Sequence, residues 1–178
     1  MKRVIIFIDG SNVYHNLKKL FEDKIPSSFN YKKFIESIVG EDILIKTYYY
    51  NCSLDWKKDP EKYARQQRFF SKLRKIPNFE LILCRMQKVN VDGKIIYQVK
   101  EDDIHLASDM IDLAYKNFYD RAILVSSDGD FAPAVEIVKK AGKEVENIGF
   151  EDNFSWHLKQ KCTKFQMITK DKLKDFFE

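Results

Sequence analysis

Histidine and cysteine are both scarce in this sequence, which contains only three of each. The cysteines lie far apart and form no CxxC pair, so the sequence supports neither a zinc site nor a disulfide framework. We expect reduced thiols, as in a cytoplasmic protein. The histidines show no metal-ligand spacing, and His105 falls on the polar face of its helix. A histidine-based nuclease or a Ser-His-Asp hydrolase therefore has little support.

Glycine and proline are also few, with six and four among 178 residues, which argues against long disordered segments. No apolar run approaches the length of a membrane span. The apolar run after Arg3 is too short for a signal sequence, and Asp9 interrupts it. No G-x-x-x-x-G-K loop is present, which disfavours a nucleotide-triphosphate enzyme. We expect one cytoplasmic domain, residues 1–178, with a core of its own.

The net charge of +4 permits a nucleic-acid partner without demanding one. Basic residues gather in one stretch, where only Asp59 and Glu61 oppose them and four aromatic residues are interleaved. This pattern suits phosphate neutralisation and base stacking along single-stranded RNA. The alternative, which is more common, is a solvated helix whose aromatic side chains face the core. The basic residues are Lys57, Lys58, Lys62, Arg65, Arg68, Lys72, Arg74 and Lys75.

Short apolar runs alternate with helical patterns along the whole chain, which predicts an α/β fold with a mainly parallel sheet. Asp92-Gly93, between two β-forming runs, predicts a hairpin over Val89–Tyr97. The predicted strands are Val4–Ile8, Leu44–Tyr50, Phe79–Arg85, Ala122–Val125, Val145–Ile148 and Phe165–Ile168. The predicted helices follow Asn12 and Asn153, cover Tyr31–Val39, Glu61–Leu73, Asp103–Phe118 and Phe131–Ala141, and run from Thr169 to about Phe177.

Acidic residues follow two of the most apolar predicted strands. Asp9 comes directly after the first, and Asp128 follows Val125 through Ser126-Ser127. Ligands of parallel sheets bind at the carboxyl ends of strands, so both carboxylates are candidates for a site. Each could instead be an ordinary turn residue or helix cap. Asp130 is balanced between capping the next helix and serving a site.

A third candidate carboxylate lies in the predicted helix Asp103–Phe118. At 100° per residue, Asp103 falls near the middle of the apolar face, and Asp109 falls just beyond its edge. An acid in a first helical turn is ordinary, because the helix dipole stabilises it. Alternatively, a metal ion would compensate Asp103, Asp9 and Asp128 together. Clustered carboxylates suit Mg²⁺ or Mn²⁺, ions that promote phosphodiester hydrolysis.

Three segments of the chain resemble, in order, the motif blocks of NYN domains, which are LabA-like members of the PIN-like nuclease superfamily. Phe7–Tyr14 resembles the opening block. Lys100-Glu101-Asp102-Asp103, followed by Leu106–Met110, resembles the lysine-x-x-aspartate helix. Leu124–Phe131, with Pro133, resembles the third block. The family often has glycine where Glu101 and Ser127 stand here.

The resemblance implies a PIN-like three-layer α/β/α sandwich that cleaves RNA with bound metal. It implies that Asp9, Asp103 and Asp128 are catalytic metal ligands and that Asp109 and Asp130 complete the metal site. The residues implied to bind or position the substrate are Ser11, Asn12, Lys100, Ser126 and Ser127.

We therefore expect a metal-dependent endoribonuclease that uses Mg²⁺ or Mn²⁺ and acts on RNA, in particular single-stranded RNA. A homodimer is expected only by analogy. The main alternative is a catalytically weak or inactive RNA-binding or scaffold module of the same fold. A haloacid-dehalogenase-type phosphatase is disfavoured, since its D-x-D motif would need an aspartate where Ser11 stands.

Overall fold

The structure is a computed structural model that describes residues 1–99 and 101–177. These residues form eight strands, seven α-helices and two short 3-10 helices, and helices separate the strands except in the run from β3 to β5. The strands are β1 Arg3–Asp9, β2 Ile43–Cys52, β3 Phe79–Cys84, β4 Met86–Val91, β5 Lys94–Val99, β6 Arg121–Val125, β7 Glu144–Phe150 and β8 Lys164–Ile168. The helices are α1 Gly10–Leu20, η1 Pro26–Ser28, α2 Tyr31–Val39, α3 Pro60–Leu73, α4 Asp102–Tyr115, η2 Gly129–Phe131, α5 Ala132–Lys140, α6 Trp156–Lys161 and α7 Lys170–Lys174.

The centre of the fold is a six-stranded parallel sheet in the order β3-β2-β1-β6-β7-β8. The chain builds this sheet outward from β1 to β3, returns to the other side of β1 as β6, and then continues to β8. The strand order therefore reverses between β1 and β6. In open α/β sheets the carboxyl ends of the strands at such a reversal form the usual ligand-binding position.

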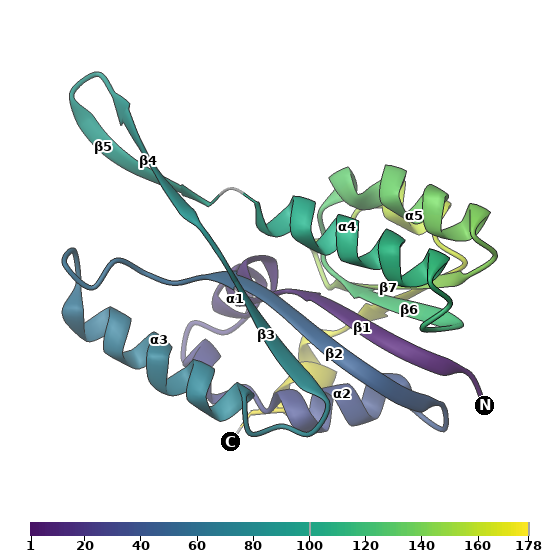
Figure 1. The fold of residues 1–178 in the computed structure, drawn as a ribbon. Coiled ribbons are helices and arrows are strands. Elements are labelled where there is room, and N and C mark those ends of the chain that lie inside the picture. The colour runs from purple at the N-terminus through teal and green to yellow at the C-terminus, as the bar shows by residue number, and fades with distance from the viewer. Residues whose placement is uncertain (100, 178) are drawn as a thin grey trace.

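Helices cover both faces of the sheet, which gives the predicted three-layer sandwich (Figure 1). The helices α1, α2 and α3 pack on one face, and α4 and α5 pack on the other. Alternation along β1 explains the two cores, because Ile6 and Ile8 face the first core and Ile5 and Phe7 face the second. The unbroken apolar run of this strand is therefore buried on both sides.

Strands β4 and β5 form a hairpin that stands away from the sandwich (Figure 1). Asp92 and Gly93 occupy its turn with φ angles of 51° and 78°. These are the left-handed angles that a two-residue hairpin turn requires, so the predicted hairpin is confirmed. Its strands extend further toward the sheet than predicted, and β5 leads by way of residue 100 into α4.

Two predicted helix caps differ in the structure. Ser155, not Asn153, caps α6, because its side chain accepts a hydrogen bond from the Leu158 N–H. Asp130 caps nothing, because a 3-10 turn precedes α5, and Asp128 caps that turn. The predicted Thr169 cap of α7 is confirmed. Among residues 1–99 and 101–177, no helix has both the length and the apolar character needed to cross a membrane.

Gly10 lies where α1 leaves β1, in close contact with the neighbouring strand β2. A Cβ atom at this position would overlap the buried ring of Tyr49 and lie 2.7 Å from the Tyr50 carbonyl oxygen. We therefore expect Gly10→Ala to lower the free energy of unfolding by about 1–3 kcal/mol. Urea denaturation measures this change, with Ser11→Ala as the control. Equal stability of the two variants would contradict the close approach.

Candidate metal centre

Asp9 is the last residue of β1 and lies next to the point at which the strand order reverses. Its side chain is only 6% exposed. One carboxylate oxygen, Oδ1, accepts a hydrogen bond from the Asn12 N–H at 3.0 Å, so Asp9 also caps α1. The other, Oδ2, accepts a hydrogen bond from the Ser126 hydroxyl at 2.9 Å. Asp9 thus joins the end of β1 to the end of β6.

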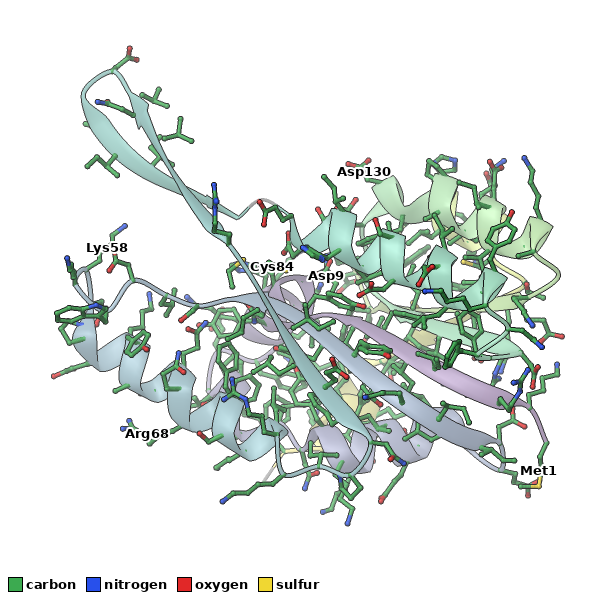
Figure 2. The ribbon with its side chains drawn as sticks, in the orientation of Figure 1. Met1, Asp9, Lys58, Arg68, Cys84 and Asp130 are labelled. Carbon is green, nitrogen blue, oxygen red and sulfur yellow. The ribbon has the colours of Figure 1, made fainter. Side chains whose placement is uncertain are left out.

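The first turn of α4 brings two more carboxylates to this edge. Asp102 is 8% exposed and lies on the buried line of the helix with Leu106 and Met110. Oxygen atoms of Asp9, Asp102 and Asp103 all lie within 4.8 Å of one another. We refer to these three residues as the acidic cluster. It lies at the carboxyl edge of the sheet, where Figure 2 labels Asp9 close to the start of α4.

The predicted burial of Asp103 is wrong: its side chain is exposed, and Asp102 is the buried acid. The buried line of α4 runs through Asp102, Leu106 and Met110, and Asp103, one position further along the helix, is turned away from that line. Asp103 nevertheless lies close to Asp9, as the sequence predicted. Asp102 was missed, although its spacing of four residues from Leu106 could have indicated its position.

Burial and mutual repulsion raise the pKa values of Asp9 and Asp103. The pKa of Asp9 rises from 3.8 to about 7, mainly because burial disfavours its charged form, and the charges of Asp103 and Asp102 add to this. The pKa of Asp103 rises to about 6, because surrounding atoms partly shield its carboxylate from water although the residue is exposed, and because the charges of Asp102, Asp128 and Asp130 add to this. Charge on these two carboxylates is therefore disfavoured in the folded protein, and a cation beside them would offset that cost.

Asp128 and Asp130 approach the cluster from the β6 side. Their charges act on Asp103, so both lie near it, but neither belongs to the close triad. The Asp128 Oδ1 accepts a hydrogen bond from the Asp130 N–H at 2.9 Å, and the Asp130 side chain is exposed. Figure 2 shows Asp130 further out than Asp9, on the side of α5. Asp128 and Asp130 therefore lie beside the acidic cluster, outside its three members.

Asp109 makes a contact that the sequence did not predict. Its Oδ2 accepts a hydrogen bond at 2.8 Å from the Tyr50 hydroxyl, which links α4 to β2. Asp109 lies about two turns along α4 from Asp102 and is not part of the triad. Asp109 therefore lies outside the acidic cluster, and its assignment as a metal ligand stays a prediction.

A polar network connects the loops around the cluster. The Asn12 side-chain oxygen accepts hydrogen bonds from the Ser127 N–H at 3.0 Å and from Asn16 Nδ2 at 2.9 Å. The Ser126 hydroxyl, which donates to Asp9, accepts from the Asp128 N–H at 3.1 Å. Asn12, Ser126 and Ser127 are therefore all engaged in holding α1 against the loop after β6.

The network continues through two residues that the sequence did not single out. Asn153 Nδ2 donates to Asn16 Oδ1 at 2.6 Å, and the Ser127 hydroxyl donates to the Asn153 carbonyl oxygen. The loop after β7 is thus connected to the same edge. Asn16 stands one turn after Asn12 on α1, which the sequence alone could have indicated. Ser11 is half-buried in the same helical turn as Asp9's partner Asn12, and Lys100 lies outside the described residues.

The residues present fit a divalent metal ion. Three carboxylates within 4.8 Å repel one another, and a cation between them would remove that repulsion. The donors are all oxygen atoms, which suits Mg²⁺ or Mn²⁺. Two buried thiols, Cys52 and Cys84, lie on adjacent positions of β2 and β3. Burial and the charge of Asp102 raise their pKa values to about 12 and about 11, so they stay protonated and are poor ligands.

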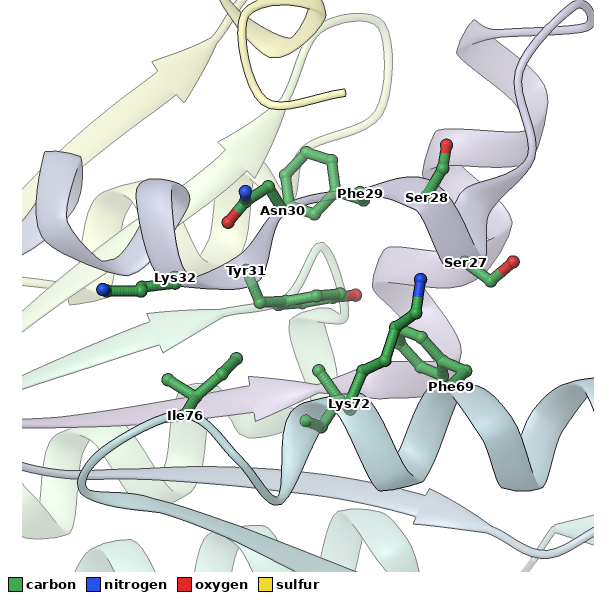
Figure 3. A pocket seen from close by; sticks show the side chains of 10 residues that line it. Ser27, Ser28, Phe29, Asn30, Tyr31, Lys32, Phe69, Lys72 and Ile76 are labelled. Atoms are coloured by element: carbon green, nitrogen blue, oxygen red, sulfur yellow. The ribbon is translucent and has the colours of Figure 1, made fainter. Parts of the chain in front are cut away.

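A separate pocket lies between α3 and the segment from η1 to α2 (Figure 3). Its volume is about 160 Å³, and Tyr31, Phe69 and Lys72 are among the side chains that line it. These elements cover the face of the sheet opposite to α4. The pocket contains no carboxylate of the acidic cluster, so it does not contribute to that site.

Comparison with known proteins identifies the family. The NYN domain family model matches residues 3–169, which is nearly the whole chain. The chain belongs to the NYN domain family. A search of curated proteins found no significant match. NYN domains are members of the PIN-like nuclease superfamily, so the acidic cluster lies in a nuclease-type fold.

Solved structures with the same arrangement include a protein of unknown function from Vibrio parahaemolyticus. It is 26% identical, and the alignment covers 94% of this chain and 93% of that one with a TM-score of 0.73. The nicotinic acid mononucleotide adenylyltransferase of Plasmodium falciparum is 10% identical over 95% of this chain and 75% of that one. Its TM-score of 0.37 is too low to support an argument.

Glu101 has a backbone conformation that favours glycine. This residue precedes α4 with a φ of 95°, in the left-handed region that glycine occupies readily. Glycine is the residue often found there in the family. We expect Glu101→Gly to raise the free energy of unfolding by about 1 kcal/mol, because it removes the steric strain of the side chain. Chemical denaturation tests this, and Glu101→Ala, which keeps a Cβ atom, should show no gain.

The raised pKa of Asp9 predicts how stability depends on pH when a chelator removes divalent metal. The folded protein keeps the Asp9 proton up to about pH 7, whereas the unfolded chain releases it near 3.8. The folded state therefore binds more protons between these pH values, and the free energy of unfolding should fall as the pH rises across them. Thermal unfolding at a series of pH values measures this, and Asp9→Asn should flatten the decline.

Added Mn²⁺ should restore stability at neutral pH in the wild type, because the ion binds the folded state only. The Asp9→Asn variant should gain much less. A stability that rises between pH 4 and 7 in the wild type, with no response to Mn²⁺, would contradict the metal assignment.

Proposed function

We propose that the protein is a metal-dependent endoribonuclease that hydrolyses phosphodiester bonds of RNA. The observation that carries this proposal is the acidic cluster of Asp9, Asp102 and Asp103 at the carboxyl edge of the sheet in an NYN domain. The ion would be Mg²⁺ or Mn²⁺, in keeping with the oxygen-only donor set.

In this proposal Asp9, Asp102 and Asp103 hold the ion, and Asp128 and Asp130 extend the negative surface beside them. A bound divalent ion lowers the pKa of a water molecule and stabilises charge on phosphoryl oxygens. Compared with the ligands that the sequence favoured, this set adds Asp102 and leaves out Asp128, Asp130 and Asp109, of which Asp109 accepts a hydrogen bond from Tyr50.

The chain's own polar residues would then serve as positioning groups. Asn12 and Ser126 hold the two oxygens of Asp9 through their N–H and hydroxyl groups. Ser127 holds the loop after β6 against α1 through its N–H. We assign direct contact with substrate phosphates to Ser11 and Lys100, which precede or follow the acids in the chain.

The basic stretch supports a polyanionic substrate. All eight of its lysines and arginines are exposed on α3 and the segments beside it, which fits both interpretations of the stretch. The interleaved aromatic residues divide between two roles. Phe69 and Phe70 pack in or against the core, so they do not offer stacking surfaces, whereas Trp56 is exposed. Phosphate neutralisation, and not base stacking, is therefore the part we assign to α3.

The proposal predicts metal-dependent cleavage of labelled single-stranded RNA, supported by Mn²⁺ or Mg²⁺ and abolished by chelator. We expect Asp9→Asn and Asp102→Asn each to lower kcat/KM by ~100-fold or more, because each removes a charge from the cluster. The control is Asp112→Asn, on the same helix but exposed and paired with Lys116. It should cleave like the wild type.

Absence of cleavage by folded protein, on several RNAs and with both metals, would overturn the nuclease proposal. Tight RNA binding in the same experiment would then indicate an RNA-binding module. Equal losses in the Asp112→Asn control would show that the effect does not come from the acidic cluster.

A further inference from the structure

Both tryptophans of the chain have side chains that are largely open to solvent. Trp56 is 59% exposed, and Trp156 is 64% exposed. A large aromatic side chain gains free energy when it is covered, so an exposed ring in the right place offers a binding surface. Both tryptophans follow carboxyl ends of strands, at the edge of the sheet that carries the acidic cluster.

In the strand order of the sheet, the two tryptophans come on either side of the acidic cluster. Trp56 follows the carboxyl end of β2, and Trp156 follows the carboxyl end of β7. In the sheet, β2 and β7 are the outer neighbours of β1 and β6. Asp9 ends β1 and Asp128 follows β6, so the acids lie between the two rings in the strand order.

Contacts with the site hold the segment that carries Trp156. The Ser127 hydroxyl donates to the Asn153 carbonyl oxygen. A Cβ atom on Gly129 would lie 2.9 Å from the Ser155 hydroxyl oxygen, so the η2 turn and the start of α6 touch directly. Trp156, next to Ser155, is thus placed relative to Asp128 by short-range contacts.

A lysine ammonium lies over each ring. The Lys159 ammonium lies 4.6 Å from the centre of the Trp156 ring, and the Lys57 ammonium lies 5.8 Å from that of Trp56. An aromatic surface next to a cation can take both parts of a nucleotide, because the base stacks and the phosphate pairs with the ammonium. Only unpaired bases have free faces to offer.

Resting on the function proposed above, we propose that Trp56 and Trp156 are stacking platforms for unpaired bases of an RNA strand that crosses the acidic cluster. The strand would lie along the carboxyl edge of the sheet with its scissile phosphate between the two platforms. The substrate class is therefore single-stranded RNA, and a duplex would lack the bases that the platforms bind.

Tryptophan fluorescence tests this directly, because the chain has only these two tryptophans. Trp56→Phe and Trp156→Phe each leave one reporter ring. In the presence of chelator, which prevents cleavage, a uridine oligomer of about 10 nucleotides should quench the fluorescence of each single-tryptophan protein. A duplex RNA of the same length should quench neither.

Alanine substitutions measure the contribution of each ring. Trp56→Ala and Trp156→Ala should each weaken binding of the oligomer by about 5- to 150-fold. The matched control is Tyr115→Ala, a side chain that is also 64% exposed but lies at the far end of α4 from the acidic cluster. The control should bind as the wild type does. The phenylalanine variants keep a stacking surface, so their affinity should fall less than that of the alanine variants.

Failure of this inference can be distinguished from failure of the proposed function. Metal-dependent RNA cleavage without quenching of either tryptophan would overturn the platforms and leave the nuclease intact. Quenching by single-stranded RNA without any cleavage would support the platforms and overturn the nuclease. Equal quenching by duplex RNA, or equal loss in Tyr115→Ala, would overturn the platforms.

Discussion

The carboxylate of Asp9 is almost completely buried, and hydrogen bonds to it join α1 and the loop after β6. Such burial is costly unless hydrogen bonds or a cation compensate for it. Asp9 receives one hydrogen bond from the first turn of α1 and one from Ser126 at the end of β6. These two bonds moderate its pKa, but the nearby acids of α4 act in the opposite direction. The hydrogen bonds do not fully compensate the burial and the repulsion, and a divalent ion at this edge could do so.

The parallel sheet determines where this carboxylate can lie. Because the chain moves outward from β1 to β3 and then returns as β6, β1 and β6 are neighbours in space although more than 100 residues separate them. Their carboxyl ends are open, since the connections leave toward opposite faces. Loops from α1, β6 and β7 can therefore meet there, and Asn12, Ser127 and Asn153 join them.

In the function we propose, α4 and α3, on opposite faces of the sheet, have different roles. The helix α4 supplies Asp102 and Asp103, and the buried line of Leu106, Met110 and Ala114 fixes that helix on the sheet. On the opposite face α3 buries Phe70 and Leu73 and leaves its basic residues in solvent. The basic residues and the acidic cluster thus lie on different helices, so their charges do not neutralise each other.

The sequence by itself determined the elements and the acids at their ends. The apolar run Val4–Ile8 predicted a doubly buried strand, Asp92-Gly93 predicted a hairpin, and Asp9 and Asp128 were found at strand ends, because these features depend on local periodicity and turn chemistry. Tertiary structure decided which side chains meet. It placed Asp102 with Asp9, turned Asp109 toward Tyr50, and set Trp56 and Trp156 on one edge. These contacts depend on the order of the strands and on how each helix packs on the sheet. A helical wheel describes one helix alone and contains neither.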